Sequence, residues 1–140
     1  MNKKVLIAVV ATSIGAAIGT YVVNTLMGKG STLSFDKMLM QIAEEMNKSL
    51  PMMIDKETRL DATFPGPGNR LTYSYTLINY EKDNLDITTL RETFRPQLLT
   101  NYKTHENMKR FRENNVELHY QYKDMHGAFI TDISISPSDF

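Results

Sequence analysis

The residues of this chain best suited to proton transfer at neutral pH are its three histidines. His119 lies on the polar side of a predicted strand, and the neighbouring predicted strand carries Asp132. A carboxylate beside an imidazole can orient it as a general base, so this pair would suit a hydrolase. A solvated histidine on a strand is the commoner arrangement. We therefore predict no catalytic residues and keep the hydrolase as an alternative.

The other candidate sites for a metal, cofactor or phosphate group are incomplete. His105 and Glu106 begin like the zinc motif HExxH, but Lys109 stands where the second histidine is needed. Gly66 and Gly68 are followed neither by a predicted helix nor by a Lys-Ser/Thr pair, as a phosphate loop requires. The chain has no cysteine, which excludes thiol nucleophiles and Cys-based zinc sites. The sequence thus predicts neither a metal nor a cofactor.

Two groups of residues could form a contact surface for a protein, a small ligand or a glycan. One is a stiff, exposed turn between two predicted strands, and the other is a set of strand tyrosines that would form an aromatic platform if they faced solvent. The residues of this possible surface are Pro65, Gly66, Pro67, Gly68, Tyr73 and Tyr122. A plain hairpin tip and a tyrosine core are the competing interpretations.

The periodicity of apolar residues predicts the elements that position these side chains. Residues 34–50 have helical spacing, with Ser34 as N-cap and Pro51 as the stop. Residues 58–64, 71–80, 116–123 and 128–136 read as strands, and residues 86–114 as a helical region that Pro96 kinks or divides. The order α-β-β-α-β-β predicts an α+β domain with an antiparallel four-stranded sheet and helices on one face.

The N-terminus has the composition of a membrane anchor. Residues 5–27 contain no charged side chain, and about 20 such residues suffice for a transmembrane helix. Lys3 and Lys4 precede the segment, which places residues 1–4 in the cytoplasm and, after a linker of residues 28–33, the domain of residues 34–140 outside. We expect a single-pass protein of the bacterial inner membrane with a periplasmic or extracellular domain. A signal peptide cleaved near residues 15–17 is the alternative.

The sequence also narrows the class of partner. Ala11, Gly15 and Gly19 are spaced four apart and would let the predicted membrane helix pack against another copy or another envelope protein. After residue 30 the chain carries 13 basic and 16 acidic residues, so it has no net attraction for nucleic acid. We therefore expect the membrane and other envelope proteins as partners.

Several segments resemble the signature of a family of small uncharacterised bacterial proteins that are exported or membrane-anchored. They are LPMMIDKETRLD at residues 50–61, the Gly66-Pro67-Gly68 turn, LTYSYTL at residues 71–77 and MKRFR at residues 108–112. The resemblance covers roughly residues 45–136 and implies export without a known activity. It also implies cysteines near position 104 and at the C-terminus, where this chain has Thr104 and Phe140 and so lacks any such disulfide.

These observations lead to one expectation for function. We predict a membrane-tethered, extracytoplasmic interaction domain that serves as an accessory component of a bacterial envelope assembly.

Overall fold

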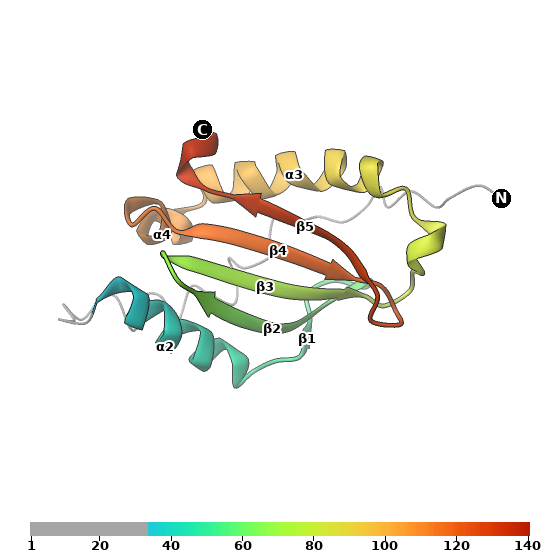
Figure 1. Ribbon diagram of the computed structural model, residues 1–140, viewed down its shortest axis with the longest axis horizontal. Helices are drawn as coiled ribbons and strands as arrows, with labels where there is room; N and C mark the ends of the chain where they lie inside the picture. The colour runs from blue at the N-terminus through green and yellow to red at the C-terminus, as the bar shows by residue number, and fades with distance from the viewer. Residues whose placement is uncertain (1–33) are drawn as a thin grey trace.

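A mixed five-stranded sheet forms the centre of the computed structural model, which describes residues 34–140 (Figure 1). The strands lie in the order β1-β2-β3-β4-β5. All neighbouring strands are antiparallel except β3 and β4, which are parallel. Their bounds are β1 (Met52–Met53), β2 (Thr58–Gly66), β3 (Arg70–Leu77), β4 (Glu117–Lys123) and β5 (Phe129–Ile135).

The predicted four-stranded antiparallel sheet with helices on one face is therefore wrong in the number and the direction of its strands. The two hairpins, β2–β3 and β4–β5, exist as expected, but the sheet joins them through the parallel pair. The reason is the long helical connection after β3, which returns the chain to the end of the sheet where β3 began. In addition, the short strand β1 extends the sheet beyond β2, where Met52 pairs with Leu60 and Met53 with Arg59.

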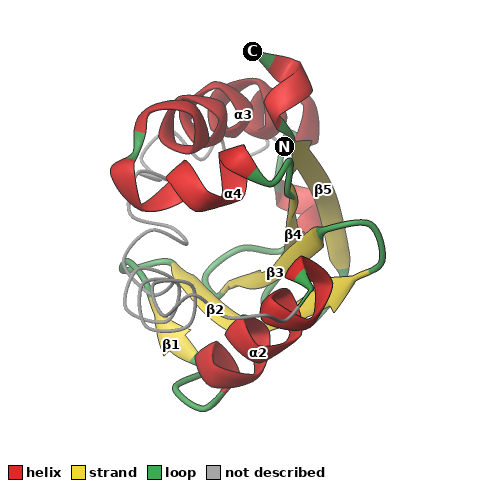
Figure 2. Ribbon diagram, turned by 90° about the vertical axis from the view of Figure 1, so that its left-hand side faces the viewer, coloured by secondary structure: helices red, strands yellow, loops and turns green. Residues whose placement is uncertain are grey.

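Within residues 34–140, three α-helices flank the sheet: α2 (Phe35–Asn47), α3 (Ile87–Thr104) and α4 (Lys109–Glu113). Helix α2 begins as predicted, with the Ser34 side chain accepting a hydrogen bond from the Lys37 amide. Helix α3 is capped by Asp86 and continues through Pro96 without a break. Figure 1 shows α3 along the β5 side of the sheet and α2 along the β2 side, and Figure 2 shows α4 beside α3.

Three short 3-10 turns complete the described part of the chain: η2 (Lys82–Asn84), η3 (Glu106–Met108) and η4 (Pro137–Asp139). The predicted membrane segment of residues 5–27, with its packing residues Ala11, Gly15 and Gly19, lies outside the described residues. Within residues 34–140, no helix combines the length and the apolar character needed to cross a bilayer.

The centre of the core is a stack of four tyrosine rings on β3 and β4. Tyr73 stacks on Tyr120 and Tyr75 on Tyr122, with ring centroids 5.4 and 5.1 Å apart. All four side chains are fully buried. The stack reaches α3 through Phe94, whose ring lies 5.3 Å from that of Tyr122. These rings therefore connect the two hairpins across the parallel pair.

Side chains from the helices cover backbone groups of the edge strand β5 and of the part of β2 that β1 does not reach. The Asn47 amide pairs with β2 like a short strand, because it donates to the Thr63 carbonyl at 3.0 Å and accepts from the Thr63 N–H at 2.8 Å. At the other edge, the Arg91 guanidinium of α3 donates to the Asp132 carbonyl of β5 at 2.8 Å. Polar side chains thus occupy backbone hydrogen-bonding positions that neighbouring strands would otherwise fill.

The hydrogen bonding of the buried tyrosine hydroxyls predicts how their removal changes stability. The Tyr120 hydroxyl is buried without a hydrogen-bond partner, whereas the Tyr102 hydroxyl donates to the Val116 carbonyl at 2.7 Å. Removing an unpaired buried hydroxyl is neutral or stabilising, while removing a paired one leaves its acceptor unsatisfied. We expect Tyr120→Phe to keep or raise the free energy of unfolding and Tyr102→Phe to lower it by about 1–2 kcal/mol. Urea denaturation measures both, and equal losses in the two variants would contradict the assignment.

Candidate functional site

The turn between β2 and β3 forms an exposed apolar surface together with α2. Pro65 and Pro67 are exposed, and they line a shallow pocket of about 280 Å³ with Gly66, Asp36 and Met40. The Met40 side chain remains 58% exposed. Phe64, which precedes the turn, is 53% exposed. We call Met40 and residues 64–67 the tip surface.

Asn69 fixes the tip surface to three other elements. Its backbone N–H donates to the Asp36 carboxylate of α2 at 3.1 Å, and its side-chain amide donates to the Asn114 carbonyl after α4 at 2.9 Å. Its carbonyl accepts from the Glu117 N–H at the start of β4, also at 2.9 Å. Asn69 has a φ of 57°, a left-handed conformation that asparagine tolerates better than most residues. These three hydrogen bonds therefore hold the turn in one conformation.

The structure separates the predicted contact residues into two groups. Pro65, Gly66, Pro67 and Gly68 lie at the molecular surface, as a contact loop requires. Tyr73 and Tyr122, in contrast, are fully buried, so they belong to the core and not to an aromatic platform. Burial raises the pKa of both hydroxyls far above the ordinary value, which keeps them neutral at physiological pH.

Sequence reasoning did not identify Met40 and Asn69 as surface-forming residues. A signal existed for Met40, because it falls off the apolar stripe of its helix and a large apolar residue there must be exposed. For Asn69 the sequence indicates only that the residue lies in a turn. Its three hydrogen bonds could not be predicted, because they reach segments up to 48 positions away in the chain.

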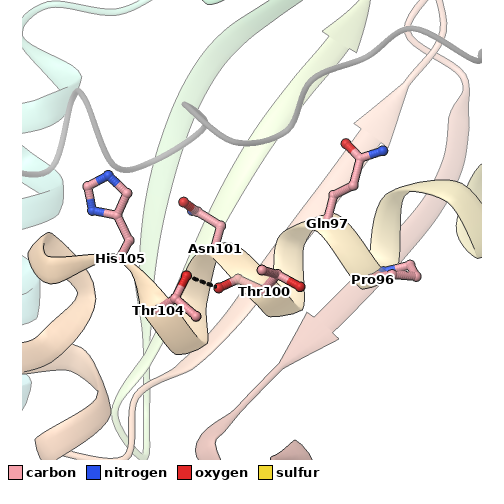
Figure 3. A pocket seen from close by; sticks show the side chains of 6 residues that line it. All are labelled: Pro96, Gln97, Thr100, Asn101, Thr104 and His105. Carbon is pink, nitrogen blue, oxygen red and sulfur yellow. Dashed lines mark hydrogen bonds between the residues drawn. The ribbon is translucent and has the colours of Figure 1, made fainter.

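A second surface feature lies on the C-terminal half of α3. A pocket of about 450 Å³ is lined by Pro96, Gln97, Thr100, Asn101, Thr104 and His105. Figure 3 shows the side chains of Gln97, Asn101 and His105 projecting from the same side of the helix. Asn101 is only 6% exposed, and its Nδ2 atom has no hydrogen-bond partner. None of the six residues is an aspartate, glutamate, lysine or arginine.

The two residues of the alternative hydrolase site do meet across β4 and β5. His119 Nδ1 lies 3.1 Å from the Asp132 carboxylate. The second ring nitrogen, Nε2, lies 3.4 Å from the Glu117 carboxylate and makes no hydrogen bond with it. The imidazole thus lies between two carboxylates. A general base needs one nitrogen turned toward the group that it deprotonates, so the geometry suits a structural contact between β4 and β5 better.

Two further carboxylates have perturbed acidity. Burial tends to raise the pKa of Asp61, but hydrogen bonds from Thr76 and Arg59 and the charges of Arg59 and Lys123 outweigh it and lower the pKa. The backbone N–H of Lys82 is the main cause of a lowered pKa at Asp124. Neither carboxylate joins a metal-binding cluster, since residues 34–140 contain no converging group of three His, Cys, Asp or Glu side chains.

Comparison with known proteins identifies a family and a fold. Residues 34–128 match the model of a family described as a domain of unknown function, DUF8479. No curated protein shows a significant match to the chain.

Three solved structures resemble the chain. A protein from Pseudomonas aeruginosa described as secreted is 16% identical, covers 75% of this chain and 94% of its own, and has a TM-score of 0.60. The pilotin of the Vibrio vulnificus type 2 secretion system is 9% identical, with 74% and 88% coverage and a TM-score of 0.57. A type II secretion pilotin from Vibrio cholerae is 8% identical, with 75% and 91% coverage and a TM-score of 0.57. At these identities the likeness shows a shared fold.

The bonds of Asn69 predict how the tip surface responds to mutation. Asn69→Ala should lower the free energy of unfolding by about 1–2 kcal/mol, because it removes the bond to Asn114 and disfavours the left-handed backbone. Asn69→Gly removes the same side-chain bond but tolerates the backbone, so its loss should be smaller. Urea denaturation gives the ranking, and an Asn69→Gly variant less stable than Asn69→Ala would contradict it.

Asp124 predicts a pH dependence of stability. Its carboxylate accepts backbone N–H bonds from Lys82, His126 and Ala128, which favour the charged form and lower the pKa in the folded state. The stabilisation is therefore present above the unfolded-state pKa of about 3.8 and is lost as pH falls through the folded-state pKa. Asp124→Ala should lower the melting temperature by about 4–8 °C at pH 7.

The matched measurement compares the melting temperatures of the wild-type protein and Asp124→Ala at low pH. Because the wild-type carboxylate is then protonated, its advantage over Asp124→Ala should shrink steadily below pH 4. A difference in melting temperature that stays constant from pH 7 to pH 2.5 would show that the carboxylate charge is not the cause.

Proposed function

This chain belongs to the DUF8479 family, and we propose that residues 34–140 form an extracytoplasmic protein-interaction domain that is an accessory component of a bacterial envelope assembly. The observation that carries the proposal is the tip surface. It combines large exposed apolar side chains with a backbone that is already ordered, which lowers the entropic cost of binding a partner.

The fold relatives support an extracytoplasmic location. The three solved structures of the same fold are a protein described as secreted and two pilotins of type II secretion systems. The uncharged segment of residues 5–27, preceded by Lys3 and Lys4, and the resemblance of residues 50–61 to an exported family point the same way.

The chemistry of the tip surface supports a protein as the partner. Met40 and Phe64 offer apolar contact area, and methionine adapts to partners of different shape. Isolated apolar residues are common on any protein surface, but here the exposed Met40 side chain lines a pocket together with two prolines. Asp36 is the single charged residue that lines this pocket, and its carboxylate already accepts the Asn69 N–H.

Site-specific photocrosslinking in the native cell envelope tests the proposal. A photoreactive residue at position 40 should give a discrete crosslinked species, because the tip surface contacts the partner. Position 125 is a matched control: Met125 is 46% exposed and lies in the β4–β5 turn, at the opposite end of the sheet. We expect at least a fivefold stronger product from position 40, and we expect Phe64→Asp to reduce it.

Two results would contradict the proposed function. One is equal labelling from positions 40 and 125, and the other is a product from position 40 that Phe64→Asp leaves unchanged.

A further inference from the structure

One end of the domain has a local excess of positive charge. Residues 103–113 end α3 and form η3 and α4, and they contain four basic and two acidic side chains. The basic ones are Lys103, Lys109, Arg110 and Arg112, and the acidic ones are Glu106 and Glu113. Over the rest of residues 34–140, in contrast, nine basic side chains stand against fourteen acidic ones. We call residues 103–113 the basic end.

Three cations of the basic end are available to an outside ligand. Lys103, Lys109 and Arg110 are exposed, and no carboxylate within residues 34–140 forms an ion pair with any of them. Glu106 and Glu113 are also exposed, so they reduce the positive charge of this region but do not cancel it. An anionic surface that approaches the basic end therefore meets two more positive than negative charges.

The contacts that Arg112 and Lys103 make within the domain leave their charges uncompensated. Arg112 Nη1 donates to the Tyr102 carbonyl at 2.9 Å and to the His105 carbonyl at 2.8 Å, which fixes α4 to the end of α3. Lys103 Nζ lies 5.9 Å from the centre of the Phe140 ring. Carbonyl groups and aromatic rings carry no net charge, so both side chains remain sources of positive potential.

The basic end lies where the chain enters the domain. Figure 1 shows α4, the turn between β2 and β3 and the start of α2 at the same end of the sheet. Asn69 links them, because it bonds to the Asp36 carboxylate of α2 and to the Asn114 carbonyl directly after α4. The uncharged residues 5–27, whose composition favours a bilayer over water, are separated from this end by residues 28–33. Six residues span at most about 21 Å, so a bilayer that takes up the uncharged segment comes within reach of the basic end.

We propose that the basic end binds the anionic phospholipid headgroups of a bilayer. Each lysine or arginine close to an anionic membrane surface strengthens the attraction about fivefold, and salt screens it. The occupant is a lipid surface and not a soluble anion, because the uncharged segment raises the local concentration of lipid beside the basic end. The inference goes beyond the proposed function and uses no residue of the tip surface.

Phospholipid vesicles that contain the full chain and no other protein test the inference. The chain has no cysteine, so Thr104→Cys provides a single attachment site for a fluorophore at the exposed end of α3. Thr88→Cys is the matched control, an exposed threonine about 24 Å away at the start of the same helix. Spin-labelled lipid headgroups quench a fluorophore that lies near the bilayer surface.

We expect the quenching at position 104 to depend on lipid charge. It should be at least threefold stronger in phosphatidylcholine vesicles that contain phosphatidylglycerol than in pure phosphatidylcholine vesicles, and added sodium chloride should remove the difference. Quenching at position 88 should be weak in both kinds of vesicle. Flotation of the vesicles on a density gradient confirms that the protein is bound to them.

Charge-reversed variants locate the contact. Lys109→Glu combined with Arg110→Glu turns the excess of two positive charges into an excess of two negative ones, so it should abolish the effect of phosphatidylglycerol at position 104. Lys56→Glu combined with Lys82→Glu makes the same change of charge at the opposite end of the sheet and should leave that effect unchanged. All four side chains are exposed, so both double variants should keep the melting temperature of the wild-type protein.

Four results would overturn the inference. They are a protein that does not float with vesicles that contain phosphatidylglycerol, equal quenching at positions 104 and 88, quenching at position 104 that ignores lipid charge, and a lipid-charge effect that survives Lys109→Glu with Arg110→Glu. None of them depends on the partner of the tip surface, because the vesicles contain no other protein. Photocrosslinking from position 40 tests that partner separately.

Discussion

The parallel pairing of β3 and β4 is the constraint on which the rest of this structure depends. Two separate hairpins would each expose unpaired edge strands. Here β3 of one hairpin pairs with β4 of the other, from Arg70–Glu117 to Thr76–Lys123, and stacked tyrosine rings cover the junction. A parallel pair requires a crossover, and α3 with α4 supplies it. The crossover in turn sets the position of every candidate surface, because it puts the two hairpin turns at opposite ends of the sheet.

Local pattern allowed much of this fold to be predicted, but not its assembly. The helix at residues 35–47 and the strands of both hairpins follow from spacing within the chain. The parallel pairing of β3 and β4 does not follow from spacing, because the periodicity of apolar residues indicates burial but not the order of the strands in the sheet. Strand β1 has two residues, too few for any alternation to be visible. The same limit applies to Tyr73 and Tyr122, whose alternation fits a buried face and an exposed aromatic one equally well.

The candidate surfaces also differ in how far the sequence could predict them. The turn at residues 65–68 could be predicted from its prolines and glycines, which need no knowledge of the fold. The pocket on the C-terminal half of α3 could not, since it depends on a helix that runs through Pro96 and on the burial of Asn101, a residue type that is mostly exposed. The order of the tip surface likewise depends on the long-range bonds of Asn69.

The side chains bound along β2 and β5 have a consequence for self-association. A sheet with open edges is a template on which a second chain can add strands. Asn47 and Arg91 occupy part of that template with side chains that no incoming strand can extend. These two residues therefore reduce the length of free backbone that the folded domain offers to a second strand.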